Sequence, residues 1–120
     1  MTKEQFVALL TAACPETVPI LDEHLSDNDN ELLLHLLMAD TRRFCIDRFE
    51  AGDGEVLSRC LDALAKGLTD GDEYVDNAVA VCFVEDTGLW DPLMEPFIAT
   101  WPAPLREEAE RQRNWRPDHS

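Results

Sequence analysis

The stretch "GDEYVDNAVAVCFVE", residues 71–85, decides the fold. After its acidic start, seven residues from Ala78 to Val84 carry no charge, which fits either a buried strand or a buried helix. Asp72 stands where a helix cap is expected, and no partner strand is visible elsewhere to satisfy the backbone of an isolated strand. We therefore predict a central helix over about 73–86, which other helices must enclose because it is apolar on nearly every side.

A weak internal repeat agrees with a helix at this position. "GDGEV" at 52–56 and "GDEYV" at 71–75 lie nineteen residues apart. In each, glycine is expected to end one helix and Asp53 or Asp72 to cap the next. The segment after Asp53 carries one apolar stripe at helical spacing, which predicts a surface helix with a single buried face. The stripe consists of Leu57, Cys60, Leu61, Leu64 and Leu68.

The other helix signals complete an all-α reading. Thr2 and Gln5 form a capping box for a first helix, and Asn28 and Glu31 suggest a second box that opens a helix over 30–50. A short helix is expected over 16–26, short helical turns between Pro92 and Pro104, and a last helix from Pro102 to near Asn114. We predict one helical domain over 1–114, a compact bundle of five or six helices, and a frayed tail at 115–120.

Composition and cysteine spacing indicate a cytoplasmic protein. The chain has 120 residues, of which 45% are hydrophobic, and no apolar run approaches the ~20 residues that span a bilayer. The apolar segment near the start is short and amphipathic, so we expect a helix there and not an export signal. None of the four cysteines forms a CxxC pair, and we expect buried thiols in a reducing compartment and no disulfide framework. These cysteines are Cys14, Cys45, Cys60 and Cys82.

The net charge of −15 is the strongest global signal. Residues 4–41 hold eight acidic residues and no lysine or arginine, and residues 67–105 repeat that tally. Such a field repels nucleic acid and anionic membranes and accelerates encounter with basic proteins. The alternative is that the acids serve solubility alone.

Motifs for catalysis are missing from the sequence. There is no GxSxG, GxGxxG or GxxxxGK[ST] pattern, so we predict no catalytic residues and no cofactor. Glu31 and His35 lie one helical turn apart and could reach one ion, but a third ligand is not evident, and we predict no metal site. A small metal-dependent enzyme that uses Glu31 and His35 remains an alternative.

Acidic residues around the start of helix 73–86 suggest a binding face for arginine or lysine of a partner. The competing interpretation is structural: these acids stabilise the helix by interacting with the positive end of its dipole, and Asn77 forms a hydrogen bond with a loop carbonyl. The tryptophans Trp90, Trp101 and Trp115 are expected to close one end of the core, with Trp115 exposed in the tail. The predicted binding face consists of Asp27, Asp29, Asp70, Asp72, Glu73 and Asp76.

Two segments carry a resemblance to a known family. "EVLSRCLDALAKGL" (55–68) and "GDEYVDNAVAVCFVEDTGLW" (71–90) resemble a small bacterial family of acidic helical proteins, catalogued as a domain of unknown function, with a V-x-N-A-V-A-V-x-F-V/L-E helix. Some of its members look like immunity proteins that accompany toxin genes. The repeated cap pattern is also similar to HEAT-like helical repeats. The resemblance implies an all-α fold and transfers no catalytic residue.

These observations predict a non-enzymatic, acidic protein-binding domain. The expected role is that of an immunity or antitoxin protein that neutralises a basic toxin, such as a nuclease, by occupying its cationic cleft. The alternative is a generic helical scaffold or homodimer, and the sequence leaves open whether the protein is a monomer or a homodimer.

Overall fold

The segment that decides the fold is helical. The computed structural model describes residues 1–114. The side chain of Asp72 accepts a hydrogen bond from the backbone N–H of Val75 at 2.9 Å and so caps α5 (Glu73–Val79). The same helix continues through a π-helical turn, Ala80–Val84, and a 3-10 turn, Glu85–Thr87. The predicted helix over about 73–86 is confirmed, and the strand alternative is wrong.

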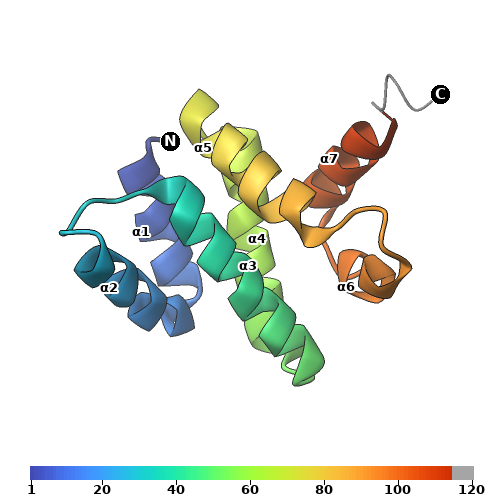
Figure 1. Cartoon of the computed structure of the whole chain (residues 1–120), viewed down its shortest axis with the longest axis horizontal. Helices are drawn as coiled ribbons and strands as arrows, with labels where there is room; N and C mark the ends of the chain where they lie inside the picture. Colours follow the sequence, from blue (N-terminus) through green and yellow to red (C-terminus); the bar gives the residue numbers. More distant parts are fainter. Residues whose placement is uncertain (115–120) are drawn as a thin grey trace.

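The described residues form an all-α fold with seven α-helices, slightly more than the five or six predicted (Figure 1). The additional one, α6, is a single turn in the proline-rich segment. No helix within residues 1–114 is both long and apolar enough to cross a bilayer. Besides α5, the helices are α1 (Lys3–Ala13), α2 (Val18–Asp27), α3 (Leu34–Glu50), α4 (Gly54–Asp70), α6 (Glu95–Ile98) and α7 (Ala103–Asn114).

Two predicted helix starts are confirmed. Thr2 and Gln5 form the reciprocal capping box of α1, with hydrogen bonds of 3.2 Å and 2.9 Å. Asp53 caps α4 by accepting from the backbone N–H of Val56 at 3.4 Å. Gly52, which precedes it, has a φ of +76°, a backbone conformation that glycine adopts without steric cost. The repeated Gly-Asp pattern therefore marks a real helix boundary.

The second capping box, at Asn28 and Glu31, is wrong. Asp29 and Asn30 have φ values of 55° and 62°, so the polar segment makes a left-handed turn, a conformation that Asp and Asn tolerate well. α3 begins only at Leu34 and has no side-chain cap from this segment. Instead, the buried ring of His24 accepts a hydrogen bond at its Nε2 from the backbone N–H of Leu33 at 3.0 Å. His24 therefore secures the entry into α3, a role that its sequence neighbours did not suggest.

α4 is more deeply enclosed than its apolar stripe predicted. It packs against α1, α3, α5 and α7, and Figure 1 shows it behind α3 and α5. Besides the predicted stripe, the small residues Ala63, Ala65 and Gly67 are buried on further sides of the helix. The predicted buried face is therefore present but wider than its stripe, while Glu55, Ser58, Asp62 and Lys66 stay exposed along one side of the helix. α4 shares the central position with α5, because small residues let neighbouring backbones approach closely.

Three thiols meet inside the core. Cys14, Cys45 and Cys60 are buried, and the sulfur atoms of Cys45 and Cys60 lie 3.3 Å apart. The hydrogen bond with Cys60, together with burial, raises the pKa of the Cys14 thiol far above its ordinary value. All four cysteines are free, and Cys82 is partly buried. The three buried thiols pack as small apolar groups, which is the structural role expected of them.

Aromatic rings close the opposite end of the core. Trp101 is buried and packs on Phe83 and Phe97, with ring centroids 5.4 Å and 5.7 Å away. Trp90, by contrast, is 52% exposed, so the expectation that it closes the core is not met. The predicted exposure of Trp115 and the predicted frayed tail at 115–120 lie outside the described residues.

Gly67 provides a test of the packing between α1 and α4. A Cβ atom at Gly67 would lie 2.6 Å from Cε1 of the fully buried Phe6. Alanine gains about 1 kcal/mol of helix propensity over glycine, but we expect Gly67→Ala to lower the free energy of unfolding by about 1–3 kcal/mol because the ring of Phe6 must move. Urea denaturation measures this difference.

The matched control lies in the first turn of the same helix. A Cβ atom at Gly54 meets nothing within 4 Å, so Gly54→Ala should change stability by no more than about 0.5 kcal/mol. A Gly67→Ala protein as stable as the unsubstituted chain would contradict the close approach of the two helices.

Candidate functional site

A groove runs between α5 and α7. It consists of two adjoining hollows of about 670 Å³ and about 440 Å³, which share Glu108 of α7 as a wall. We call the two hollows together the α5–α7 groove. Its lining residues are Glu73, Tyr74, Asp76, Asn77 and Ala80 in the larger hollow, Glu85, Trp90, Arg111 and Gln112 in the smaller one, and Glu108 in both.

The π-helical turn brings a carboxylate to this groove. In a regular α-helix Glu85 would lie about 80° around the axis from Asn77 and about 120° from Glu73. In the π turn the N–H of a residue donates to the carbonyl five residues earlier, as the N–H of Glu85 does to the carbonyl of Ala80. Successive side chains are therefore separated by a smaller angle around the helix axis than in an α-helix. Glu85 consequently lines the same groove as Glu73.

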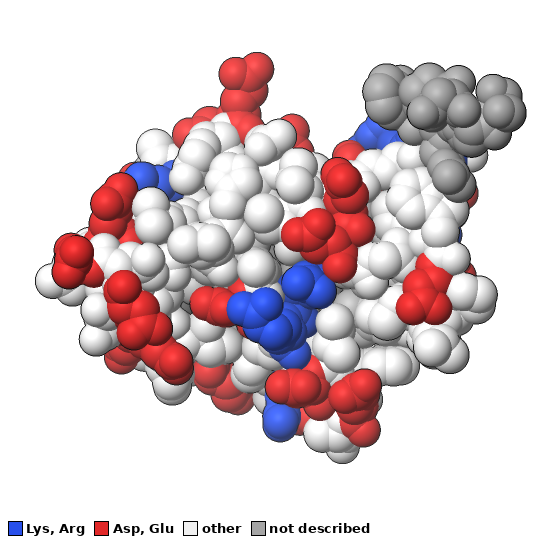
Figure 2. All heavy atoms as spheres, in the orientation of Figure 1, with Lys and Arg blue, Asp and Glu red and all other residues white. Residues whose placement is uncertain are grey.

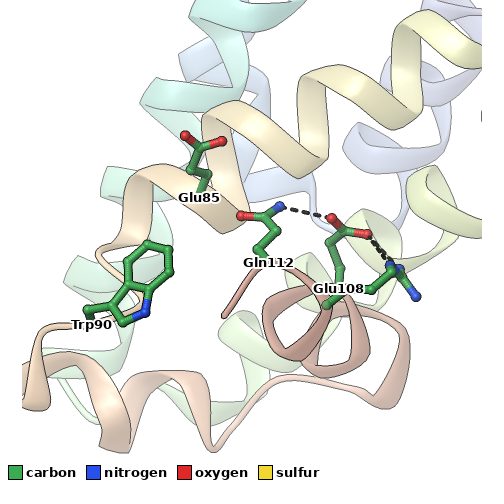
Figure 3. A pocket seen from close by; sticks show the side chains of 5 residues that line it. Glu85, Trp90, Glu108 and Gln112 are labelled. Atoms are coloured by element: carbon green, nitrogen blue, oxygen red, sulfur yellow. Dashed lines mark hydrogen bonds and ion pairs between the residues drawn. The ribbon is translucent and has the colours of Figure 1, made fainter. Parts of the chain in front are cut away.

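α7 is fastened to the π turn by one amide side chain. Nε2 of Gln112 donates to the carbonyl of Ala80 at 3.0 Å and to Oε2 of Glu108 at 2.9 Å. Two acceptors at this nitrogen fix the orientation of the amide. Its oxygen, Oε1, is buried and has no hydrogen-bond partner among residues 1–114. Figure 3 shows this oxygen directed away from Glu108, toward the side of the hollow where Glu85 and Trp90 lie.

The groove carries an excess of negative charge. Burial and the nearby carboxylate of Glu108 raise the pKa of Asp76 above its ordinary value, and Arg111 only partly opposes this shift. Arg111 is itself engaged by Glu108, to which it donates at 2.5 Å and 3.2 Å. Figure 2 shows acidic side chains gathered where the end of α5 approaches α7, beside a basic patch over α3. The groove thus holds carboxylates close together with too few cations to neutralise them.

The structure divides the predicted binding face into two parts. Glu73 and Asp76 line the groove, while Asp70 and Asp72 lie at the adjoining junction of α4 and α5. Asp72 caps α5, so its carboxylate also has a structural task. The end of α2 and the turn after it, which carry Asp27 and Asp29, lie at the far left of Figure 1, away from α5.

Sequence reasoning missed the contribution of α7. Glu108 and Gln112 face α5 only because α7 packs on the π turn, a tertiary contact between segments about thirty residues apart. The pattern of acids in α7 gave no signal for this contact, because its charges balance.

Asn77 and His35 pair with each other. Nε2 of His35 lies 3.0 Å from Oδ1 of Asn77, and the imidazole also contacts the ring of Tyr74 edge-on at 5.2 Å. The prediction that Asn77 bonds a loop carbonyl is therefore wrong. Within residues 1–114, no group of three His, Cys, Asp or Glu side chains is placed to hold a metal ion, so Glu31 and His35 gain no third ligand from this part of the chain.

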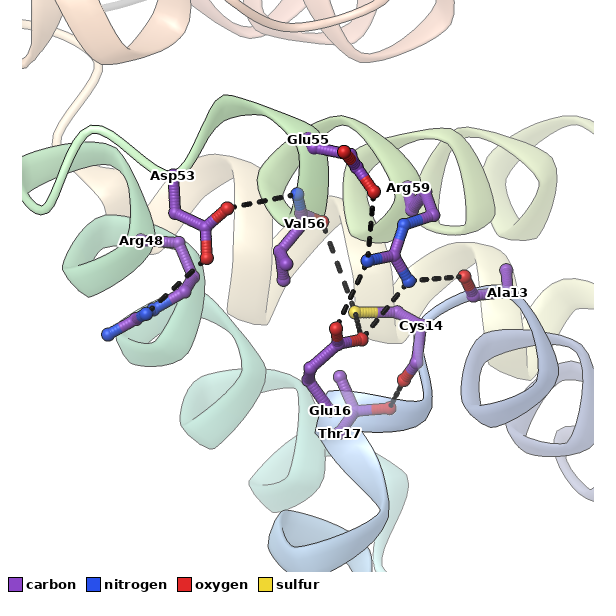
Figure 4. Close-up of polar contacts among 9 residues, drawn as sticks. All are labelled: Ala13, Cys14, Glu16, Thr17, Arg48, Asp53, Glu55, Val56 and Arg59. Atoms are coloured by element: carbon purple, nitrogen blue, oxygen red, sulfur yellow. Dashed lines mark hydrogen bonds and ion pairs between the residues drawn. The ribbon is translucent and has the colours of Figure 1, made fainter.

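A second polar cluster joins the start of α2 to α4 (Figure 4). Arg59 donates two hydrogen bonds of 3.1 Å to the carboxylate of Glu16 and one of 3.3 Å to the carbonyl of Ala13. The Cys14 thiol also donates to Glu16 at 3.5 Å. Because its charges are paired with one another, this cluster holds helices together and offers little to a ligand.

The comparisons with known proteins identify a family. The profile of the family described as Domain of unknown function (DUF7674) matches residues 7–116, and the chain therefore belongs to that family. Searches of curated proteins and of solved structures gave no significant match.

The ion pair between Glu16 and Arg59 predicts a pH dependence. The hydrogen bonds from Arg59 lower the pKa of Glu16 from 4.5 to about 2. A carboxyl whose pKa is lowered by folding contributes stability above its unfolded pKa, and this contribution is lost as the pH falls from 4.5 toward 2. We expect Glu16→Gln to lower the melting temperature at pH 7 and to make stability fall less steeply below pH 4.5.

Glu55→Gln is the matched control, because the Glu55 carboxylate is 87% exposed and lies 3.8 Å from the same guanidinium. It should leave both the melting temperature and its pH dependence close to those of the unsubstituted chain. Identical acid-side slopes for Glu16→Gln and the unsubstituted chain would contradict the assignment.

Proposed function

We propose that this member of the DUF7674 family is a non-enzymatic domain that binds a basic protein through the α5–α7 groove. The role that fits best is that of a cytoplasmic immunity or antitoxin protein that neutralises a basic toxin. The observation that carries the proposal is the excess of closely spaced carboxylates in a concave surface.

The electrostatics of the groove favour a cationic partner. The pKa of Asp76 is raised first by burial and then by repulsion from the carboxylate of Glu108, while Arg111 opposes the shift. An arginine or lysine placed between the two carboxylates would replace this repulsion with attraction. Carboxylates in a partly desolvated groove interact more strongly with a cation than fully exposed ones, because the local dielectric constant is lower.

The net charge of the chain speeds its association with a basic partner. A chain of net charge −15 attracts a basic protein at long range, and the groove carboxylates would then make the short-range contacts. Long-range steering is screened by salt, whereas partly buried contacts are screened less. Binding of this kind should weaken as salt rises while keeping its dependence on individual groove residues.

The protein encoded by the adjacent gene is the partner to test, because immunity proteins accompany the genes of their toxins. We expect a complex at low salt, measured by isothermal titration calorimetry. The double substitution Glu73→Lys with Asp76→Lys should weaken it at least about tenfold, or 1.4 kcal/mol, because repulsion replaces attraction in the groove.

The control is a double substitution of equal charge change on α2. Asp22→Lys with Asp27→Lys affects exposed residues away from the groove, and it avoids Asp29, whose positive φ disfavours lysine. We expect this variant to bind within about threefold of the unsubstituted chain. Equal losses of affinity in both double variants would show that only net charge matters and not the groove. Failure to detect a complex at low salt would refute the proposal.

A further inference from the structure

Besides the Glu108–Arg111 ion pair, whose charges neutralise each other, the smaller hollow of the α5–α7 groove combines three kinds of surface within about 440 Å³. Glu85 supplies an exposed carboxylate that has no hydrogen bond or ion pair within residues 1–114. Gln112 supplies a neutral oxygen to which no group in the described part of the chain donates. Trp90 supplies an aromatic wall (Figure 3). The two oxygen-bearing groups suit a donor with several N–H groups, and the indole suits a planar cation or its aliphatic stem.

The unpartnered oxygen is the most informative of them. A buried amide oxygen without a donor costs free energy, and the two hydrogen bonds at Nε2 prevent the amide of Gln112 from turning to relieve it. A donor that enters the hollow would satisfy this oxygen. Because the oxygen is screened from water in the unbound protein, the side chains of the hollow must adjust slightly when the donor enters.

Arginine matches this set better than lysine. A guanidinium is planar and carries five N–H donors, so it can donate to a carboxylate and to a neutral oxygen at the same time. It also stacks on aromatic faces, and its aliphatic stem packs against an apolar wall. An ammonium group is a compact, strongly hydrated charge that would lose more hydration in such a hollow.

We propose that the hollow formed by Glu85, Trp90 and Gln112 is a pocket for an arginine side chain of the basic partner. The inference rests on the proposed function, which it refines from a cationic surface to one defined residue type. Glu85 bonds the guanidinium, Gln112 Oε1 accepts a further N–H, and the larger hollow, with Asp76 and Glu73, takes neighbouring basic residues of the same partner.

A blocked tripeptide, acetyl-Gly-Arg-Gly-amide, tests the pocket without the partner. It is titrated into the full chain, and two-dimensional NMR follows the indole N–H of Trp90 and the side-chain amide of Gln112, assigned with Trp90→Phe and Gln112→Met. We expect saturable shifts of both signals in the millimolar range and at least threefold weaker binding of acetyl-Gly-Lys-Gly-amide. Glu85→Gln should weaken the arginine peptide at least threefold.

Glu50→Gln is the control, since it removes one exposed acid from the end of α3 and should leave the titration unchanged. Absence of saturable shifts at Trp90 and Gln112, or equal weakening by Glu85→Gln and Glu50→Gln, would overturn the arginine pocket. If the arginine tripeptide does not bind, but the adjacent-gene product binds and the double substitution Glu73→Lys with Asp76→Lys weakens that binding, the arginine pocket is refuted and the proposed function is retained. If the tripeptide binds but no basic protein does, the pocket stands and the proposed function falls.

Discussion

The enclosure of α4 by four other helices is the constraint on which the remaining structure depends. Burial of a single leucine such as Leu64 contributes about 1.5–3 kcal/mol, but α4 buries eight residues, and several of them are small. Gly67 lets α1 approach until Phe6 lies against the helix backbone. With α1, α3 and α7 fixed against α4, the position of α5 between them follows, and so does the groove that α5 forms with α7.

The Arg59 cluster and the α5–α7 groove differ in how their polar groups are paired. Around Arg59, the Glu16 carboxylate and the Ala13 carbonyl accept hydrogen bonds, Glu55 lies at ion-pair distance, and the ion pair with Glu16 stabilises the ionised carboxyl. In the groove, Asp76 faces another acid and Gln112 keeps an oxygen without a donor. Natural proteins satisfy nearly all their buried polar groups, so a local departure of this kind calls for an explanation such as a partner. Three buried nitrogens elsewhere in residues 1–114, Arg42 Nε, Arg48 Nε and Trp101 Nε1, also lack a hydrogen-bond partner, and the groove differs from those places in combining such an atom with an excess of carboxylates.

The sequence predicted the helices well and their mutual arrangement poorly. Asp53 and Asp72 identified two helix starts because capping is a local interaction within four residues. The stripe of α4 suggested one buried face because hydrophobicity scales give little weight to alanine and glycine, so Ala63 and Gly67 went unnoticed. His24 and Gln112 were missed for a related reason, since each acts on a backbone group that only the folded chain brings near.

In the candidate site, too, the residues set by local sequence were predicted and those brought in by tertiary contacts were not. Glu73 and Asp76 could be named from the sequence because they lie in one helix turn beside a strong helix signal. Glu108, Gln112 and Trp90 come from segments whose approach to α5 is tertiary, and the charge balance of α7 concealed its acids. The face predicted from acidic composition also joined residues of two separate segments, the end of α2 with its following turn and the start of α5, because composition does not say which side chains share a surface.

The π turn within helix 73–87 has a consequence for how this surface can evolve. Loss of one residue between Ala80 and Val84 would restore regular α geometry and turn Glu85 by about 100° around the axis. The amino-acid composition would barely change, yet the groove would lose the carboxylate at one end. In this fold, the length of a single helical turn is a determinant of the charge pattern offered to other molecules, and chains of almost identical sequence could differ in it.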